Sequence, residues 1–176
     1  MTNETLFSNI YTATSDVVKK TDVASILLSS LILIIGIAFF VVSFQFDANS
    51  DEWSMLCLLL GIAGVAYGIV RLFVNNKKTV YAPTGSNLKK TRIYFKNEDL
   101  GKVLAAINGN FASTAGLHDN EHGTVRLDIL TSADGAFAAV QAFSYQDSSY
   151  APQSAVKTFT GDSVKNVNEA IIAVTM

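Results

Sequence analysis

Two long apolar segments dominate the pattern of hydrophobic and polar positions along the chain. The first, residues 23–46, is 24 residues long and contains no charged residue. As a helix it would be about 36 Å long, against a bilayer hydrocarbon core of roughly 30 Å. The second, residues 53–74, carries a single charge, Arg71, close to its end. The pattern therefore predicts a transmembrane helical hairpin over residues 23–74, with helices at 23–46 and 53–74.

Charges on either side of these segments predict an orientation. The turn between them, residues 47–52, contains three acids and no base, whereas the outer flanks are basic. The basic flanking residues are Lys19, Lys20, Arg71, Lys77 and Lys78. By the positive-inside rule, both termini should be cytoplasmic, and we expect an inner-membrane protein of a bacterium. The first segment lacks an A-x-A-like cleavage site and is too long for a signal peptide, so we expect an anchor.

Small residues recur on both predicted helices. Gly61, Gly64 and Gly68 fall on one face of the second helix, because spacings of three and four return to the same side. Ser25 and Ser29 form a similar pair on the first helix. Such stripes allow helix backbones to approach closely. They could pack the hairpin against itself or bind another subunit, and we expect a homo-oligomer or a protein partner in the membrane.

The remaining residues, 91–176, show shorter patterns that predict a small α+β domain. Residues 91–96 alternate like a strand, and Asn97 then offers an N-cap to a helix that ends at Asn108-Gly109. Two further alternating segments, 124–131 and 136–145, follow this helix. A short strand at 155–160 and a helix after Asp162 complete the order. We expect an antiparallel sheet with helices packed on one face, following the transmembrane hairpin.

The best-defined local prediction in this domain is a β-hairpin over residues 124–145. Asp134-Gly135 suits a two-residue type I′ turn between the segments 124–131 and 136–145. That turn pairs Ile129 with Val140 and Leu127 with Ala142. The polar stretch 146–154 is then expected to be a long loop.

Two segments connect these units. Residues 1–22 are expected to be a tail that is either disordered or an amphipathic helix on the membrane surface, since Leu6, Phe7, Ile10 and Tyr11 recur at helical spacing. Residues 75–90 are expected to be a basic juxtamembrane linker. The predicted membrane-surface residues are Lys77, Lys78, Lys89, Lys90 and Arg92.

Composition narrows the possible functions. Residues 79–176 hold eight basic and nine acidic residues, a net charge of −1, so we expect no nucleic-acid partner. The element order resembles that of double-stranded RNA-binding domains, but the last helix begins with one lysine, Lys165, where phosphate binding would need several. The single cysteine, Cys57, lies in the second apolar segment, which excludes a disulfide framework or a thiolate zinc cluster.

One stretch carries a pattern associated with catalysis. His118-Asp119-Asn120-Glu121-His122 spells H-x-x-E-H, the order found in inverted zinc metalloproteases. That chemistry needs both histidines on one face of a helix, but Gly116 and Gly123 closely flank the motif. His118, Glu121 and His122 are therefore weak metal candidates, and we expect a polar loop without a cofactor.

These observations favour a non-enzymatic membrane protein that presents a small cytoplasmic interaction domain, as a structural or regulatory subunit of a membrane assembly. Two alternatives remain at this stage. The domain could bind a small ligand as a membrane-tethered sensor, or it could be a metal-dependent hydrolase centred on the H-x-x-E-H motif.

Overall fold

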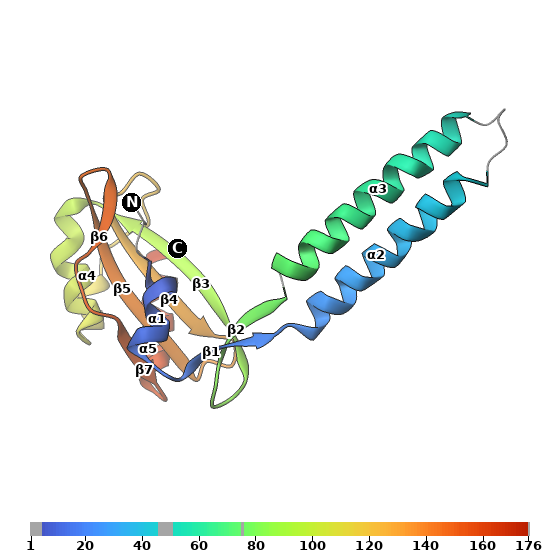
Figure 1. Ribbon diagram of the computed structural model, residues 1–176. Helices are drawn as coiled ribbons and strands as arrows, with labels where there is room; N and C mark the ends of the chain where they lie inside the picture. Colours follow the sequence, from blue (N-terminus) through green and yellow to red (C-terminus); the bar gives the residue numbers. More distant parts are fainter. Residues whose placement is uncertain (1–4, 46–50, 75, 176) are drawn as a thin grey trace. The chain divides into compact units, whose positions relative to one another are not determined.

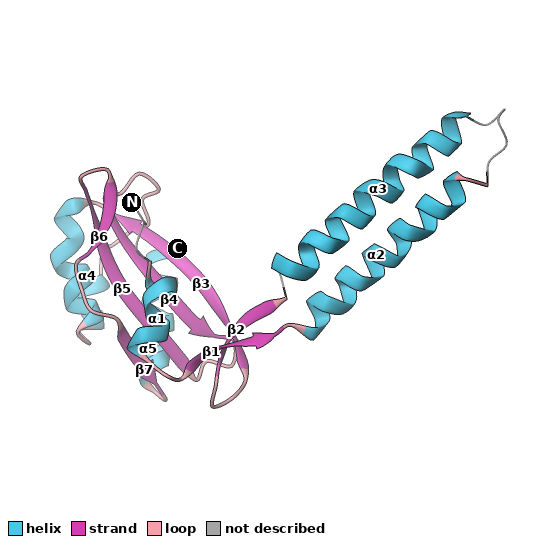
Figure 2. Ribbon diagram, viewed as in Figure 1, coloured by secondary structure: helices cyan, strands magenta, loops and turns pink. Residues whose placement is uncertain are grey.

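The computed structural model describes residues 5–45, 51–74 and 76–175 (Figures 1 and 2). Contacts within the chain define two compact units. One comprises Lys19–Lys78 and is called the helical unit below. The other combines Met1–Val18 with Thr79–Met176 and is called the α+β domain. The N-terminal segment therefore folds with the C-terminal part of the chain, although the helical unit separates them in sequence.

The helical unit contains two long antiparallel helices, α2 (Val23–Ser43) and α3 (Asp51–Val74). Asp22 begins α2 as its N-cap, where Oδ1 accepts a hydrogen bond from the Ser25 amide at 3.4 Å. Both helices are long and apolar enough to cross a membrane, with mean hydropathies of 2.8 and 2.2. The first helix is shorter than predicted and the second begins two residues earlier, at Asp51. Residues 46–50 of the predicted turn lie outside the described part of the chain.

The α+β domain is built on an antiparallel sheet, as predicted. The strands of the sheet are β1 (Val17–Thr21), β2 (Lys77–Tyr81), β3 (Ser86–Phe95), β4 (Val125–Ser132), β5 (Phe137–Gln146), β6 (Ser149–Pro152) and β7 (Lys157–Thr160). Residues 19–21 of β1 and 77–78 of β2 belong to the helical unit. The order across the sheet is β1-β2-β3-β4-β5-β6, and β7 also pairs with β5. The strands β6 and β7 occupy opposite ends of the same edge of β5.

The register of the β4–β5 hairpin is confirmed, but its turn was predicted wrongly. Ile129 faces Val140 and Leu127 faces Ala142. Gly135 has a positive φ of 70° whereas Asp134 does not, so this is not a type I′ turn. The Asp134 carboxylate instead accepts the Ala136 amide at 3.1 Å and fixes a local turn.

The expected long loop at 146–154 is also wrong, because a second hairpin occupies it. Asp147 and Ser148 have φ values of 47° and 67° and connect β5 to β6. Positive φ at both central residues is the pattern of a type I′ turn. Tyr145 pairs with Tyr150 across this hairpin. The sequence therefore forms the expected kind of turn at a position where neither central residue is glycine.

Helices cover both faces of the sheet, which corrects the prediction that they lie on one (Figure 2). On one face, η1 (Asn97–Asp99), α4 (Leu100–Ile107), η2 (Phe111–Thr114) and α5 (Ser163–Thr175) pack over a core that includes Ile93, Ile129 and Val140. On the other, α1 (Leu6–Ala13) packs Leu6 and Ile10 against Leu130, Ala139 and Phe143. Leu6 is 0% and Ile10 is 1% exposed, so α1 is a core element of the domain.

The expected basic linker is also largely structured. Residues 77–81 form β2, and the first five residues of β3 cover most of the rest. The strands β2 and β3 pair at Val80 with Asn87 and at Tyr81 with Ser86. Pro83 and Gly85 lie in the turn between them, where the sequence analysis placed a break in a linker.

Candidate functional site

The five predicted membrane-surface residues are divided between the two units. Lys77 and Lys78 belong to the helical unit, and the other three lie on β3 in the domain. Because side chains alternate along a strand, Lys89 lies on the α4–α5 face of β3, and Lys90 and Arg92 lie on the α1 face. The last two contact Phe7 of α1, with Lys90 Nζ 4.8 Å and Arg92 Cζ 5.2 Å from its ring centroid.

A buried carboxylate, Asp128, is the polar centre of the α1 face. Its side chain is fully buried in the middle of β4. Oδ1 lies 3.0 Å from Arg126 Nε and 3.4 Å from Arg92 Nε. Oδ2 accepts a hydrogen bond from the Leu6 amide at 3.2 Å. This carboxylate therefore connects the first turn of α1 to two strands that lie far along the chain.

Burial raises the pKa of the Asp128 carboxyl above its ordinary value of 3.8. The positive charge of Arg126 acts in the opposite direction, as do the Leu6 amide and Arg92. A carboxyl with a raised pKa in an enclosed site is a common feature of acid–base catalysts. Here, however, its oxygens are occupied by groups of the fold itself, which assigns Asp128 to holding α1 on the sheet.

Aromatic rings enclose the arginine beside this carboxylate. Arg126 is 4% exposed, and its Cζ lies 4.5 Å from the Phe143 ring centroid and 4.4 Å from that of Tyr150. The Tyr150 hydroxyl donates to the Gly123 carbonyl at 3.2 Å, and burial raises the pKa of Tyr150. These contacts stabilise a buried guanidinium through cation–π interactions.

The sequence analysis missed this cluster. The β3–β4 register places Arg92 directly opposite Asp128, and the β4–β5 register places Gln141 on its other side. The β3–β4 register was needed to see that the two arginines converge on one carboxylate. The signal available in the sequence was a charged residue, Asp128, in the middle of an apolar strand.

The H-x-x-E-H segment is a loop that closes an edge of the sheet. The Asp119 carboxylate accepts the Tyr94 amide at 3.0 Å, and the Asn120 amide donates to the Tyr94 carbonyl at 2.8 Å. His118 and Glu121 line the same surface hollow, and His122 is not among its lining residues. Within residues 5–45, 51–74 and 76–175, no three His, Cys, Asp or Glu side chains lie close enough to hold a metal ion.

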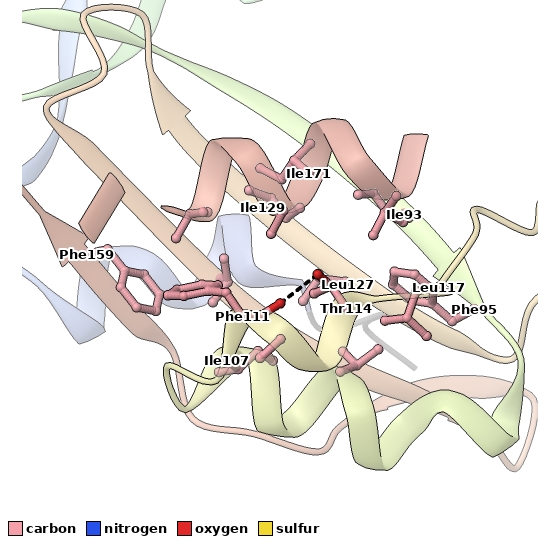
Figure 3. A pocket seen from close by; sticks show the side chains of 16 residues that line it. Ile93, Phe95, Ile107, Phe111, Thr114, Leu117, Leu127, Ile129, Phe159 and Ile171 are labelled. Carbon is pink, nitrogen blue, oxygen red and sulfur yellow. Dashed lines mark hydrogen bonds between the residues drawn. The ribbon is translucent and has the colours of Figure 1, made fainter. Parts of the chain in front are cut away.

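A small cavity lies inside the opposite core, between the sheet, α4 and α5 (Figure 3). Its volume is about 40 Å³, and Ile93, Phe111, Leu117, Phe159 and Ile171 are among its lining residues. Thr114 is the one polar residue in the lining, and its hydroxyl donates to the Phe111 carbonyl at 2.7 Å. Metabolite sites are usually several hundred Å³ with convergent polar groups, so this cavity does not support the sensor hypothesis.

The glycines of α3 lie against α2 within the same chain. A Cβ on Gly61 would lie 2.6 Å from the Phe40 amide nitrogen, and one on Gly68 would lie 3.1 Å from Leu33 Cα. Gly64 faces Gly36, which the sequence analysis did not single out.

Ser25 and Ser29 of α2 do not supply the atoms nearest to the three α3 glycines. Those atoms belong to Leu33, Gly36, Phe40 and Ile32. Ser29 is buried, and its hydroxyl bonds to the Ser25 carbonyl at 2.7 Å.

Comparison with known families gives one match. Residues 18–79 match the model of a family described as a domain of unknown function, DUF8460. This range coincides closely with the helical unit, Lys19–Lys78. No curated protein and no solved structure matches the chain. What the chain shares with that family is therefore the hairpin with its two adjoining strands.

Proposed function

We propose that this chain is a non-enzymatic integral membrane protein whose α2–α3 hairpin anchors the α+β domain at the cytoplasmic face. In this role it is a structural or regulatory subunit of a membrane assembly. One observation carries the proposal: α1, which precedes the hairpin, packs in the same domain as the residues that follow it. The segments before and after the hairpin must therefore lie on one side of the membrane, as an even number of spans requires.

The exposed apolar surface of the hairpin supports the membrane assignment. Only 11% of the residues in the most apolar window of α2 are buried, and 17% in that of α3. A core helix of a soluble protein would be mostly buried. Leu27, Ile34 and Leu59 are 65%, 63% and 56% exposed, respectively. Side chains of this kind are stable in lipid and unfavourable in water.

The packing of α1 also argues against a cleaved signal sequence. Cleavage after α2 would remove Leu6 and Ile10 from the core and the Leu6 amide from Asp128. A segment that supplies core residues to the mature domain is part of the finished protein. The apolar helix that follows it is therefore an anchor in this proposal.

The distribution of charge supports the orientation. Basic residues at one end of the hairpin, and Asp51 and Glu52 at the start of α3, give the asymmetry of the positive-inside rule. The glycine stripe of α3 is occupied by α2, so it no longer argues for an oligomer. A partner within the membrane would bind the outward faces of the two helices.

Topology can be tested with single cysteines. In a Cys57→Ser background, Asn49→Cys reports the turn, and Lys165→Cys reports α5, where the lysine side chain is 77% exposed. We expect a membrane-impermeant maleimide added to intact cells to label the first variant at once. The second should be labelled only after the membrane is permeabilised.

Two controls make this test decisive. Extraction with alkaline carbonate should leave both variants in the membrane fraction, because peripheral proteins are released by this treatment and spanning helices are not. Labelling of Lys165→Cys in intact cells would contradict the orientation. Release of the protein by carbonate would contradict membrane insertion altogether.

A further inference from the structure

The open end of the helical hairpin continues into a two-stranded ribbon formed by β1 and β2 (Figure 1). At one end of the ribbon the Asp22 amide donates to the Asn76 carbonyl at 2.8 Å. At the other end the Ala82 amide donates to the Asp16 carbonyl at 2.6 Å. The same number of residues separates the two hydrogen bonds on each strand, and the strands run in opposite directions. Lys20 therefore lies directly opposite Lys78.

This pairing is unfavourable for the protein alone. In a hydrogen-bonded antiparallel pair, opposing Cα atoms are about 5.5 Å apart and the side chains lie on the same face. Like charges at that position destabilise a sheet. Among the described residues, neither Lys20 nor Lys78 forms an ion pair with a carboxylate. The neighbouring acid on this face, Asp22, instead caps α2 through the Ser25 amide.

The surroundings of the pair add more positive charge. Lys19 and Lys77 lie on the opposite face of the ribbon by strand alternation. Arg71 lies in the last turn of α3, where its guanidinium donates to the Tyr67 hydroxyl at 3.3 Å. All five residues belong to the helical unit. A negatively charged group from outside the chain would relieve the repulsion between Lys20 and Lys78.

We infer that the Lys20–Lys78 pair binds the phosphate of an anionic phospholipid headgroup. The inference rests on the proposed membrane topology, because the apolar helices begin at Val23 and end at Val74, a few residues from the pair. In a spanning hairpin, these positions lie at headgroup depth. Two ammonium groups on one face can contact the oxygens of a single phosphate. Each basic residue near an anionic surface raises the binding constant by about a factor of five.

The test compares lipid binding by matched variants of the full chain. Wild type is compared with Lys20→Gln/Lys78→Gln and with a control, Lys157→Gln/Lys165→Gln, whose lysines are exposed on the domain. The two variants lose the same charge. Each is reconstituted in nanodiscs of phosphatidylcholine and phosphatidylglycerol, and the lipids retained on the protein are identified by native mass spectrometry. We expect the ribbon variant to lose preference for phosphatidylglycerol by roughly thirtyfold. The control should retain it.

Additional variants and controls distinguish failure of lipid binding from failure of the membrane proposal. Lys20→Arg/Lys78→Arg should retain the preference, because arginine also binds phosphate. Equal loss in the control, no loss in the ribbon variant, or complete competition by inorganic phosphate would each overturn the inference. Carbonate extraction of the wild type distinguishes these results from failure of the membrane proposal. A wild type that stays in the membrane without a lipid preference contradicts only the inference made here.

Discussion

At the scale of single residues, Asp128 is the side chain whose polar contacts hold α1 on the sheet. Its carboxylate contacts Arg126, Arg92 and the Leu6 amide while being fully buried. Replacing a buried ion pair by well-packed apolar residues is often neutral, but removing one partner leaves an uncompensated charge. Arg126, 4% exposed between two aromatic rings, is the group that would be left.

We therefore expect Asp128→Ala to lower the free energy of unfolding of the α+β domain by about 3–5 kcal/mol. Pulse proteolysis of the detergent-solubilised chain in urea would measure it. Glu169→Ala is the matched control, because Glu169 is an exposed acid in the middle of α5. Its effect should be within about 0.5 kcal/mol. Equal effects of the two substitutions would contradict a structural role for Asp128.

The raised pKa of Asp128 has a consequence for the pH dependence of stability. The folded state binds the Asp128 proton more tightly than the unfolded state, so this contribution is fully present below pH 3.8. It is lost as the pH rises through the raised pKa of the folded protein. The stability of wild type relative to Asp128→Asn should therefore fall with increasing pH above 3.8. A difference that stays constant or grows with pH would show that ionised Asp128 is the favoured form.

At the scale of elements, sequence patterns were sufficient for the two apolar helices, the antiparallel sheet and the register of β4 with β5. Predictions from these patterns failed where one local pattern is compatible with two environments. The apolar spacing of Leu6 and Ile10 suits a membrane surface or a protein core equally well. The β5 sequence held the missing information: six of the eight residues Phe137–Ser144 are apolar, and a strand with so little alternation is covered on both faces. All eight are buried in the structure.

Turns and polar clusters were harder to predict for a different reason. Asp134-Gly135 has the composition of a type I′ turn, but the hydrogen bond that the Asp134 carboxylate accepts from the Ala136 amide favours another local conformation. Asp147 and Ser148 adopt positive φ without glycine because the pairing of Tyr145 with Tyr150 determines their geometry. The arginines around Asp128 converge only through the register of β3 with β4. The two turns depend on side-chain and cross-strand contacts close in sequence, and the cluster depends on contacts between distant residues; spacing alone contains neither.

The hairpin gives a prediction at the same scale. A Cβ on Gly36 would lie 2.6 Å from the Val65 amide nitrogen of α3, so Gly36→Leu must force the helices apart. We expect a loss of about 1–3 kcal/mol, as for other overpacked contacts, and a lower melting temperature in mild detergent. Ala63→Leu is the control, since Ala63 is exposed on α3. A Gly36→Leu variant that melts with the wild type would show that α2 and α3 do not pack as described.

At the scale of the whole molecule, the chain is a domain interrupted by a hairpin. The domain core draws on residues before α2 and after α3, and the family match at residues 18–79 falls on the interruption. Each strand of the β1–β2 ribbon contains residues of both units, and a main-chain hydrogen bond joins the two strands at each end of the ribbon. The described residues of the predicted linker, 76–90, are largely strand and turn.

The contact between Leu6 and Asp128 spans 122 residues, and this separation bears on how the protein is made. During synthesis α1 emerges first, and its site on β4 and β5 emerges only after both apolar helices. Closing so long a loop by diffusion is entropically unfavourable, and the penalty grows with loop length. A hairpin that forms first brings residues 22 and 76 together, which shortens the effective loop before the sheet is complete. In the proposed topology, pairing of α2 with α3 would therefore precede the packing of α1 on β4 and β5.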